Sequence, residues 1–155
     1  MRWMFIIAAA VFIVDQLSKY YVLRFLRLDI RLGIDVFPPF FNLRMAWNTG
    51  INFGWIASDQ DLTRWILIAV ALMITVWVIW WMRREQRPIA RISAGFLIGG
   101  ALGNVLDRLV YGAVADFINM SCCGIDNPFA FNIADVAIFV GAFGLILFTG
   151  QRKTT

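Results

Sequence analysis

The stretch "WILIAVALMITVWVIWWM", from Trp65 to Met82, contains no charged residue. At about 1.5 Å per residue, a helix of this length nearly crosses the ~30 Å hydrocarbon core of a bilayer. The composition of the whole chain also favours a membrane protein, since its 155 residues are 61% hydrophobic and 15% charged. A soluble domain is roughly half apolar and about a quarter charged. The sequence therefore predicts an integral membrane protein with a single domain over residues 1–155.

Three further apolar stretches predict spans, at about 3–23, 89–110 and 129–149. The first contains charged residues in its middle and is too long for a cleaved signal peptide. The stretch at 89–110 carries Gly95, Gly99 and Gly103 at intervals of four, a spacing that lets helices approach closely in lipid. We interpret these glycines as packing residues. The expected fold is an all-α membrane protein with four transmembrane helices and a small extracytoplasmic β-hairpin or cradle.

Basic residues predict how the spans are oriented. The loop between the second and third spans is the densest in arginine, with Arg83, Arg84, Arg87 and Arg91. Cytoplasmic loops of membrane proteins are enriched in Lys and Arg, so this loop and both termini are expected in the cytoplasm. Segments 26–64 and 111–130 then lie outside, although 26–64 also carries basic residues. The net charge of +4 is better explained by topology than by nucleic-acid binding.

The outer segment contains a strand pattern. In "FNLRMAWN", from Phe41 to Asn48, apolar and mostly polar residues alternate, and a second alternating run follows the turn residues "NTG" at 51–55. Alternation around a short turn predicts a β-hairpin with one apolar face. That face has two interpretations: it rests on the bilayer or a lipid-bearing ligand, or it packs against the protein's own helices.

Ionisable residues inside the apolar stretches are candidates for function. Asp15 and Lys19 are four apart on one helix face, which favours an ion pair. Asp107 and Arg108 are adjacent and cannot face each other, so each needs other partners. Asn104 lies four residues before Arg108 on the same face, where the two are expected to hold a polar group at the outer end of the third span.

Asp116 and Asp135 border the last two apolar stretches, and Asn132 shares a helical face with Asp135. If the chain between the acids folds back, their carboxyl groups meet and share one proton. Such a pair supplies a base and an acid for hydrolysis. It does so without a metal or histidine, and the chain has no histidine. The alternative is that both acids are ordinary helix caps or polar anchors.

Four stretches resemble the motif regions of the lipoprotein signal peptidase (signal peptidase II) family, in the right order along the chain. They are "VDQLSKYYV" (14–22), "NTGINFG" (48–54), "GNVLDRLVYGAVADF" (103–117) and "FNIADVAIF" (131–139). The resemblance implies a bacterial inner-membrane aspartic peptidase with four spans, an extracytoplasmic β-cradle and no cofactor or metal. It also implies removal of the signal peptide from prolipoproteins, on the amino side of a cysteine that carries diacylglyceryl.

The resemblance also implies roles for individual residues. Asp116 and Asp135 match the catalytic pair. The positions that match supporting or substrate-binding residues are Asn104, Arg108, Asn132, Asn48, Gly50, Asp15 and Lys19. Asn52 departs from the family, which often has a small apolar residue there. The insert "SCCG" is not required by the motifs, and Cys122 and Cys123 are interpreted as small loop residues or a redox pair.

Two other classes of function compete with a peptidase. A small transporter or proton relay would use Asp15, Lys19, Asp107 and Asp135, but the charge-free second span offers it no ionisable group. An inert assembly subunit would use the glycine stripe for docking. The expected partners of a peptidase are the diacylglyceryl-modified precursor and membrane lipid, with no nucleic acid, and the protein is expected to be a monomer.

Overall fold

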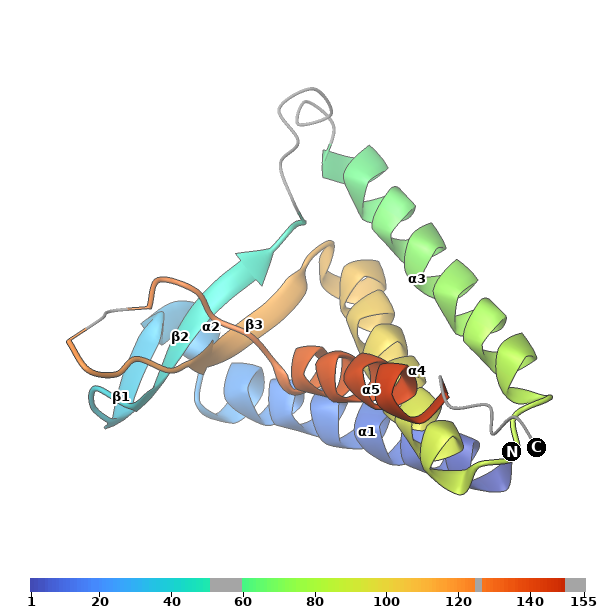
Figure 1. The fold of residues 1–155 in the computed structure, drawn as a ribbon. Helices are drawn as coiled ribbons and strands as arrows, with labels where there is room; N and C mark the ends of the chain where they lie inside the picture. The colour runs from blue at the N-terminus through green and yellow to red at the C-terminus, as the bar shows by residue number, and fades with distance from the viewer. Residues whose placement is uncertain (51–59, 125–126, 150–155) are drawn as a thin grey trace.

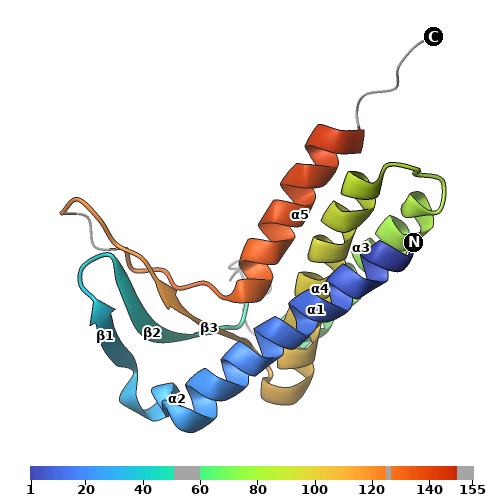
Figure 2. The same ribbon diagram turned by 90° about the horizontal axis from the view of Figure 1, so that it is seen from below.

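The computed structural model describes residues 1–50, 60–124 and 127–149. These residues form a bundle of helices with a small β-sheet at one end (Figures 1 and 2). The long helices are α1 (Arg2–Tyr20), α3 (Gln60–Met82), α4 (Pro88–Tyr111) and α5 (Ile133–Thr149). A π-helical stretch, η1 (Tyr21–Phe25), continues α1, and the short α2 (Leu28–Arg31) leads into the sheet.

Among the described residues, three helical segments are long and apolar enough to cross a membrane: Arg2–Phe25, Asp61–Met82 and Pro88–Tyr111. They confirm three of the predicted spans and make the chain a multi-pass membrane protein. Helix α5 is shorter, with 17 residues. Its expected start near 129 is wrong, because the amide of Asn132 caps the helix by accepting the backbone N–H of Asp135 at 2.8 Å.

Helix α4 lies at the centre of the bundle and contacts α1, α3 and α5 (Figure 1). A Cβ atom added at Gly95 would lie 2.6 Å from the carbonyl oxygen of Met4 on α1. At Gly99 the same atom would lie 2.5 Å from the carbonyl oxygen of Ala8. These contacts leave no room for a side chain, so the interpretation of the glycine stripe as a packing surface is confirmed.

The sheet has three antiparallel strands in the order β1 (Gly33–Phe37), β2 (Phe41–Asn48) and β3 (Val114–Asn119). Only β2 was predicted. It pairs with β1 through a turn that contains a cis Pro38–Pro39 bond, and with β3 from the segment expected to be an outer loop. Within the described residues, the expected small hairpin or cradle is thus a three-stranded sheet, one strand larger than a hairpin. The predicted strand at 51–55 lies outside the described residues.

The apolar side chains of β2 pack within the protein. Leu43 forms a buried cluster with Val22, Leu28 and Phe117, and Phe41 and Met45 are packed against it. This contact supports the second interpretation of the strand, in which its apolar face covers the protein's own elements. Trp47 differs, since it is 44% exposed and its ring centroid lies 5.5 Å from that of Tyr111 at the end of α4.

The chain after β3 returns to the same place before α5 begins. Ile118 and Phe131 exchange backbone hydrogen bonds, with N–O distances of 2.8 and 3.0 Å. The side-chain amide of Asn119 also donates to the carbonyl oxygens of Asn127 and Phe129, at 2.7 and 2.8 Å. The two ends of the loop are therefore clamped together, which brings the start of α5 beside β3.

Candidate active site

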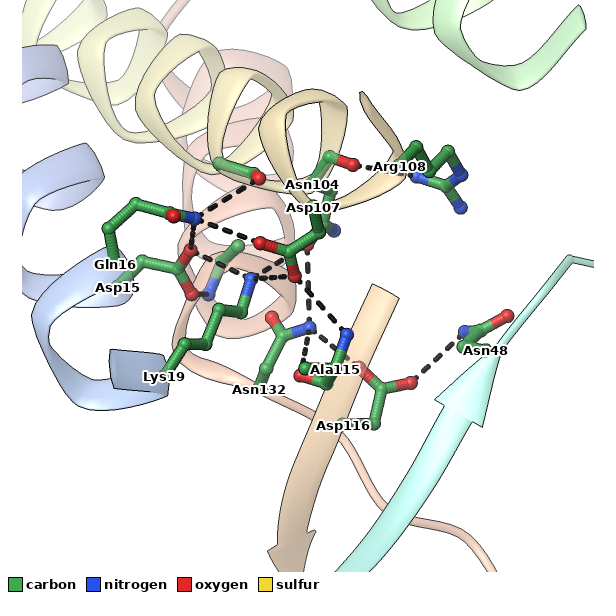
Figure 3. Close-up of polar contacts among 12 residues, drawn as sticks. Asp15, Gln16, Lys19, Asn48, Asn104, Asp107, Arg108, Ala115, Asp116 and Asn132 are labelled. Atoms are coloured by element: carbon green, nitrogen blue, oxygen red, sulfur yellow. Dashed lines mark hydrogen bonds and ion pairs between the residues drawn. The ribbon is translucent and has the colours of Figure 1, made fainter. Parts of the chain in front are cut away.

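Asp116 lies on β3, and its side chain is buried with 3% of its surface exposed. Two asparagine amides donate hydrogen bonds to its carboxylate (Figure 3). Asn132 Nδ2 lies 2.6 Å from Asp116 Oδ1, and Asn48 Nδ2 lies 3.1 Å from Asp116 Oδ2. Both carboxylate oxygens are thus held by side chains from other elements, β2 and the residue that precedes α5.

Asp135 lies in the first turn of α5 and is half-buried. Asn104 Nδ2 donates to its Oδ1 at 2.9 Å, and the backbone N–H of Asn132 donates to its Oδ2 at 3.3 Å. Asn132 therefore contacts both acids, through its side-chain amide to Asp116 and through its backbone to Asp135. The structure brings the two acids together, as the folding-back of the chain between them predicts.

The neighbourhood of Asp116 changes its acidity. Burial, and after it the negative charge of Asp135, raise the pKa of the Asp116 carboxyl to about 6. The hydrogen bonds from Asn48 and Asn132 oppose this rise. A carboxyl group with this pKa holds a proton at mildly acidic pH while a neighbouring carboxylate is ionised, which is the arrangement required for paired acid and base chemistry.

A second pair of acids lies next to the first and shares one cation (Figure 3). Lys19 Nζ lies 2.8 Å from Asp15 Oδ2 and 2.7 Å from Asp107 Oδ2. All three side chains are buried. The predicted ion pair between Asp15 and Lys19 is confirmed, and Asp107 finds its partner in the same ammonium group rather than in its neighbour Arg108.

Gln16 completes this cluster and was missed from the sequence. Its Nε2 donates to Asp107 Oδ1 at 3.0 Å and to Asp15 Oδ2 at 3.1 Å. Asp107 in turn accepts the backbone N–H of Ala115 at 3.2 Å, which ties α4 to β3. The available signal was a polar side chain beside Asp15 within an apolar stretch, where burial requires a hydrogen-bond partner.

Two contacts join the pairs of acids. Lys19 Nζ donates to Asn104 Oδ1 at 3.3 Å, and Asn104 is the residue that donates to Asp135. Asp15 Oδ1 accepts the backbone N–H of Ala134 in the first turn of α5, at 2.9 Å. The cluster on α1 therefore anchors the start of the helix that carries Asp135.

Gly50 shapes the end of β2. Its backbone N–H donates to Asn48 Oδ1 at 2.9 Å, and its φ of +105° is a conformation that side chains other than glycine rarely adopt. An added Cβ would also lie 2.5 Å from Leu67 Cδ1 on α3. Gly50 thus positions the Asn48 side chain beside Asp116. Asn52, the departure from the family pattern, lies outside the described residues.

Arg108 faces the site from α4. Its guanidinium donates to the carbonyl oxygen of Asn104 at 3.3 Å. Of the acids that interact electrostatically with Arg108, Asp135 has the largest effect. Among the described residues its Nε has no hydrogen-bond partner. Arg108 therefore contacts the backbone of Asn104 and not its side-chain amide, and their joint hold on a polar group stays a prediction.

The described residues contain no group of three or more His, Cys, Asp or Glu side chains placed to hold a metal ion. Cys122 and Cys123 are exposed and have free thiols, and they lie in the loop after β3, apart from both acid pairs. Asp116 and Asp135 can supply the chemistry of two neighbouring carboxyl groups surrounded by amides.

The fold and the site define a class of protein: a multi-pass helical membrane protein with two carboxyl groups brought together beside a small sheet. A family model described as signal peptidase (SPase) II matches residues 7–150. The chain belongs to this family, which makes it a peptidase.

Relatives and solved structures agree with this assignment. The lipoprotein signal peptidase of Nitrobacter hamburgensis is 41% identical over 142 residues, which cover 90% of this chain and 86% of the relative. That of Alteromonas mediterranea is 40% identical over 143 residues, covering 91% and 76%. A bacterial membrane enzyme solved by the in meso method at 1.9 Å resolution has a TM-score of 0.78 and 29% identity, covering 97% of this chain and 94% of that one.

Proposed function

We propose that the chain is an intramembrane aspartic endopeptidase that removes signal peptides from bacterial prolipoproteins, cleaving on the amino side of a diacylglyceryl-modified cysteine. The observation that carries the proposal is the bridge of Asn132 between Asp116 and Asp135. Membership of the signal peptidase II family supports the peptidase activity. The names of the relatives support lipoprotein precursors as the substrate class.

The proposed reaction uses Asp116 and Asp135 as a catalytic pair that works with one water molecule. One carboxylate removes a proton from the water, which attacks the carbonyl carbon of the scissile peptide bond. The other carboxyl group is protonated and donates to the carbonyl oxygen as negative charge develops there. A peptide bond within a helix is already hydrogen-bonded, so the substrate must unwind at the cleavage site before it can react.

The signal helix of the substrate is expected to enter from the lipid between the spans, with its diacylglyceryl chains against the apolar flank of the bundle. A groove of about 330 Å³ between α1, α4 and α5 supports such a contact. It is lined only by apolar side chains, among them Val14, Ile133 and Val136. Asn104, Arg108 and Asn132 would orient the catalytic pair and the polar part of the lipid.

The proposed topology is a monomer of one domain in the inner membrane, with α5 as the fourth span, both termini in the cytoplasm and the catalytic pair near the outer face. Its support is the arrangement of charge. The loop that carries Arg83, Arg84 and Arg87 joins α3 to α4 at the end of the bundle opposite the sheet, and the N-terminus lies at that same end (Figures 1 and 2).

The test uses purified protein and a precursor that carries diacylglyceryl on its cysteine. Asp116→Asn and Asp135→Asn each remove an ionisable group, so each is expected to abolish cleavage while the protein still folds. Asp29→Asn is the matched control, because Asp29 is exposed on α2. Near-normal cleavage by either variant would contradict the catalytic pair, and equal cleavage of unlipidated precursor would contradict the proposed substrate.

The transporter and assembly-subunit alternatives are weaker. The buried acids gather with Lys19 at the sheet end of the bundle, whereas a relay needs groups spaced across the membrane. The glycine stripe is already covered by α1, so it is not free for docking. Cleavage of the lipidated precursor by the purified protein alone would exclude both alternatives.

A further inference from the structure

Three asparagine side chains around Asp116 and Asp135 are fixed in orientation. When a side-chain amide lies against a group that can only donate, its oxygen must face that group, because the NH₂ end is itself a donor. Each of these amides meets such a group through its Oδ1. Asn48 accepts the backbone N–H of Gly50, Asn132 accepts the backbone N–H of Asp135, and Asn104 accepts the ammonium of Lys19.

The fixed orientation turns an NH₂ group of every amide toward the acids. Asn48 and Asn132 donate to the two oxygens of Asp116, and Asn104 donates to Asp135. The remaining oxygen of Asp135 accepts the backbone N–H of Asn132. Each oxygen of the pair thus receives a hydrogen bond, and these amides present donors only. A proton on the pair can then be passed to the other carboxylate, to water or to the substrate.

The two acids have different surroundings, and Asp135 is the one placed as an anion. Asn132 and Asp135 exchange hydrogen bonds as a capping box, in which the backbone N–H of Asn132 needs the carboxylate as acceptor. The positive end of the α5 dipole also favours a negative charge in the first turn. Arg108 on α4 adds a cation that interacts electrostatically with Asp135 more strongly than with Asp107 or Asp116.

Asp116 is placed as a neutral acid. It lies on a strand rather than at a helix start, and only 3% of its side-chain surface is exposed, whereas Asp135 is half-buried. Removal from water disfavours the charged form of a carboxyl group. The charged groups that face the pair come from α1 and α4, namely Asp15, Lys19, Asp107 and Arg108, and the first three already neutralise one another in part.

We propose that Asp135 is the carboxylate that accepts the proton of water, that Asp116 carries the proton given to the substrate, and that Lys19 is a positioning residue that maintains this division through Asn104. The inference rests on the proposed peptidase function. The pKa of Asp116, raised to about 6 chiefly by burial, agrees with its part in the division.

The proton transfers balance over one cycle. Asp135 removes a proton from water, the resulting hydroxide bonds to the carbonyl carbon, and Asp116 gives its proton to the carbonyl oxygen. When the C–N bond breaks, Asp135 passes its proton to the leaving nitrogen. Asp116 recovers a proton from one hydroxyl group of the intermediate as the new carboxyl group forms, so both acids return to their starting states.

A matched pair of variants tests the division: Asn104→Ala removes a donor from Asp135, and Asn48→Ala removes a donor from Asp116. Each loss destabilises one anion, so its proton is lost at higher pH. In the pH profile of kcat/KM for the lipidated precursor, Asn104→Ala is expected to move the acid limb up by about one unit. Asn48→Ala is expected to move the alkaline limb up by a similar amount.

The outcomes separate the division from the proposed function itself. If Asn104→Ala moved the alkaline limb and Asn48→Ala moved the acid limb, the roles of Asp116 and Asp135 would be reversed. Unchanged limbs, or both limbs moving in both variants, would overturn the division altogether. Near-normal cleavage by Asp116→Asn or Asp135→Asn would instead overturn the catalytic pair.

The role of Lys19 is tested by Lys19→Met and by the double variant Lys19→Met/Asp107→Asn. The double variant keeps the net charge of the cluster and protects against misfolding, since it removes one cation and one anion together. Both are expected to lower kcat about 10- to 100-fold, with KM unchanged and the acid limb shifted as in Asn104→Ala.

A folded double variant with unchanged kcat and an unmoved acid limb would show that Lys19 acts on stability alone and would overturn its positioning role. Arg31→Met is the control for loss of a cation, because Arg31 is exposed on α2.

Discussion

The two acid pairs lie side by side, yet their surroundings differ in one respect. Asp15 and Asp107 share the ammonium of Lys19, at 2.8 and 2.7 Å, and both are fully buried. Asp116 and Asp135 have amides around them and no ion pair among the described residues. A cation beside a carboxylate favours its ionised form, whereas the amides around Asp116 and Asp135 are neutral and supply no opposite charge.

Under the proposed function, this difference distinguishes acids that hold the structure together from acids that react, within one network of hydrogen bonds. The pair that includes Lys19 connects α1, α4, β3 and the start of α5, through Asp15 to Ala134 and through Asp107 to Ala115. The pair without a cation sits where these elements meet. A buried acid in a membrane protein is therefore not by itself evidence of catalysis, and its partners decide its role.

The largest expected effect compares Asp135→Asn with Asp107→Asn. Loss of a catalytic carboxylate is expected to lower kcat for the lipidated precursor at least about 10³-fold, because proton transfer by that group is lost. Asp107→Asn leaves Lys19 paired with Asp15 and is expected to lower kcat about 10-fold or less. Steady-state cleavage rates check this prediction, and equal losses would remove the distinction between the pairs.

The next effect is on stability. Lys19→Met leaves two buried carboxylates without their cation and is expected to cost about 3–5 kcal/mol of the free energy of unfolding. Arg44→Met breaks the exposed ion pair with Asp35 and is expected to cost less than about 1 kcal/mol. Unfolding of both variants in the same detergent compares them, and similar costs would contradict the buried role of Lys19.

The next effect is a change in how the free energy of unfolding depends on pH. The pKa of Asp116 is raised in the folded protein, so folding favours its protonated form and the free energy of unfolding falls as pH rises from about 4 through about 6. Asp116→Asn removes that penalty, so the stability of the variant relative to the wild type is expected to be about 3 kcal/mol more favourable at pH 8 than at pH 4.

At pH 4 the Asp116 carboxyl is protonated in the folded wild type, so the penalty is absent there and the two proteins differ only in their hydrogen bonds. Thermal unfolding at both pH values measures the difference. A stabilisation that does not depend on pH would show that ionisation of Asp116 is not its cause.

The smallest effect comes from Gly103→Ala. An added Cβ would lie 2.6 Å from Asp15 Oδ2, so the carboxylate must shift from its place beside the start of α5. The expected cost is about 1 kcal/mol of stability, with a modest change in kcat. A loss of kcat comparable to that of Asp135→Asn would show that Asp15 takes part in the reaction more directly than its ion pair indicates.

Local patterns predicted the parts of the molecule that depend on neighbours in sequence. Long apolar stretches predicted the long helices, the spacing of Asp15 and Lys19 predicted their ion pair, and the glycine spacing predicted a packing surface on α4. Resemblance to the family supplied Asn48 and Gly50. These features follow from helix geometry or from short motifs.

Features that depend on contacts between residues far apart in the sequence could not be predicted from local patterns. Strand β3 was assigned to an outer loop, because its pairing with β2 joins segments about seventy residues apart, and local alternation does not report such a partner. For the same reason Gln16 and the link from Lys19 to Asp107 were missed, since both join α1 to α4. The start of α5 was placed too early, because apolar residues continue past the cap at Asn132.

The clamp between Ile118 and Phe131 has a practical consequence for labelling the protein. Both ends of the loop after β3 are fixed by backbone hydrogen bonds, and the Asn132 cap sets the register of α5 independently of the loop. Extra residues next to Gly124 would lengthen the loop without moving either acid. A short epitope or a fluorophore attached to Cys122 or Cys123 would then report on the enzyme while it works.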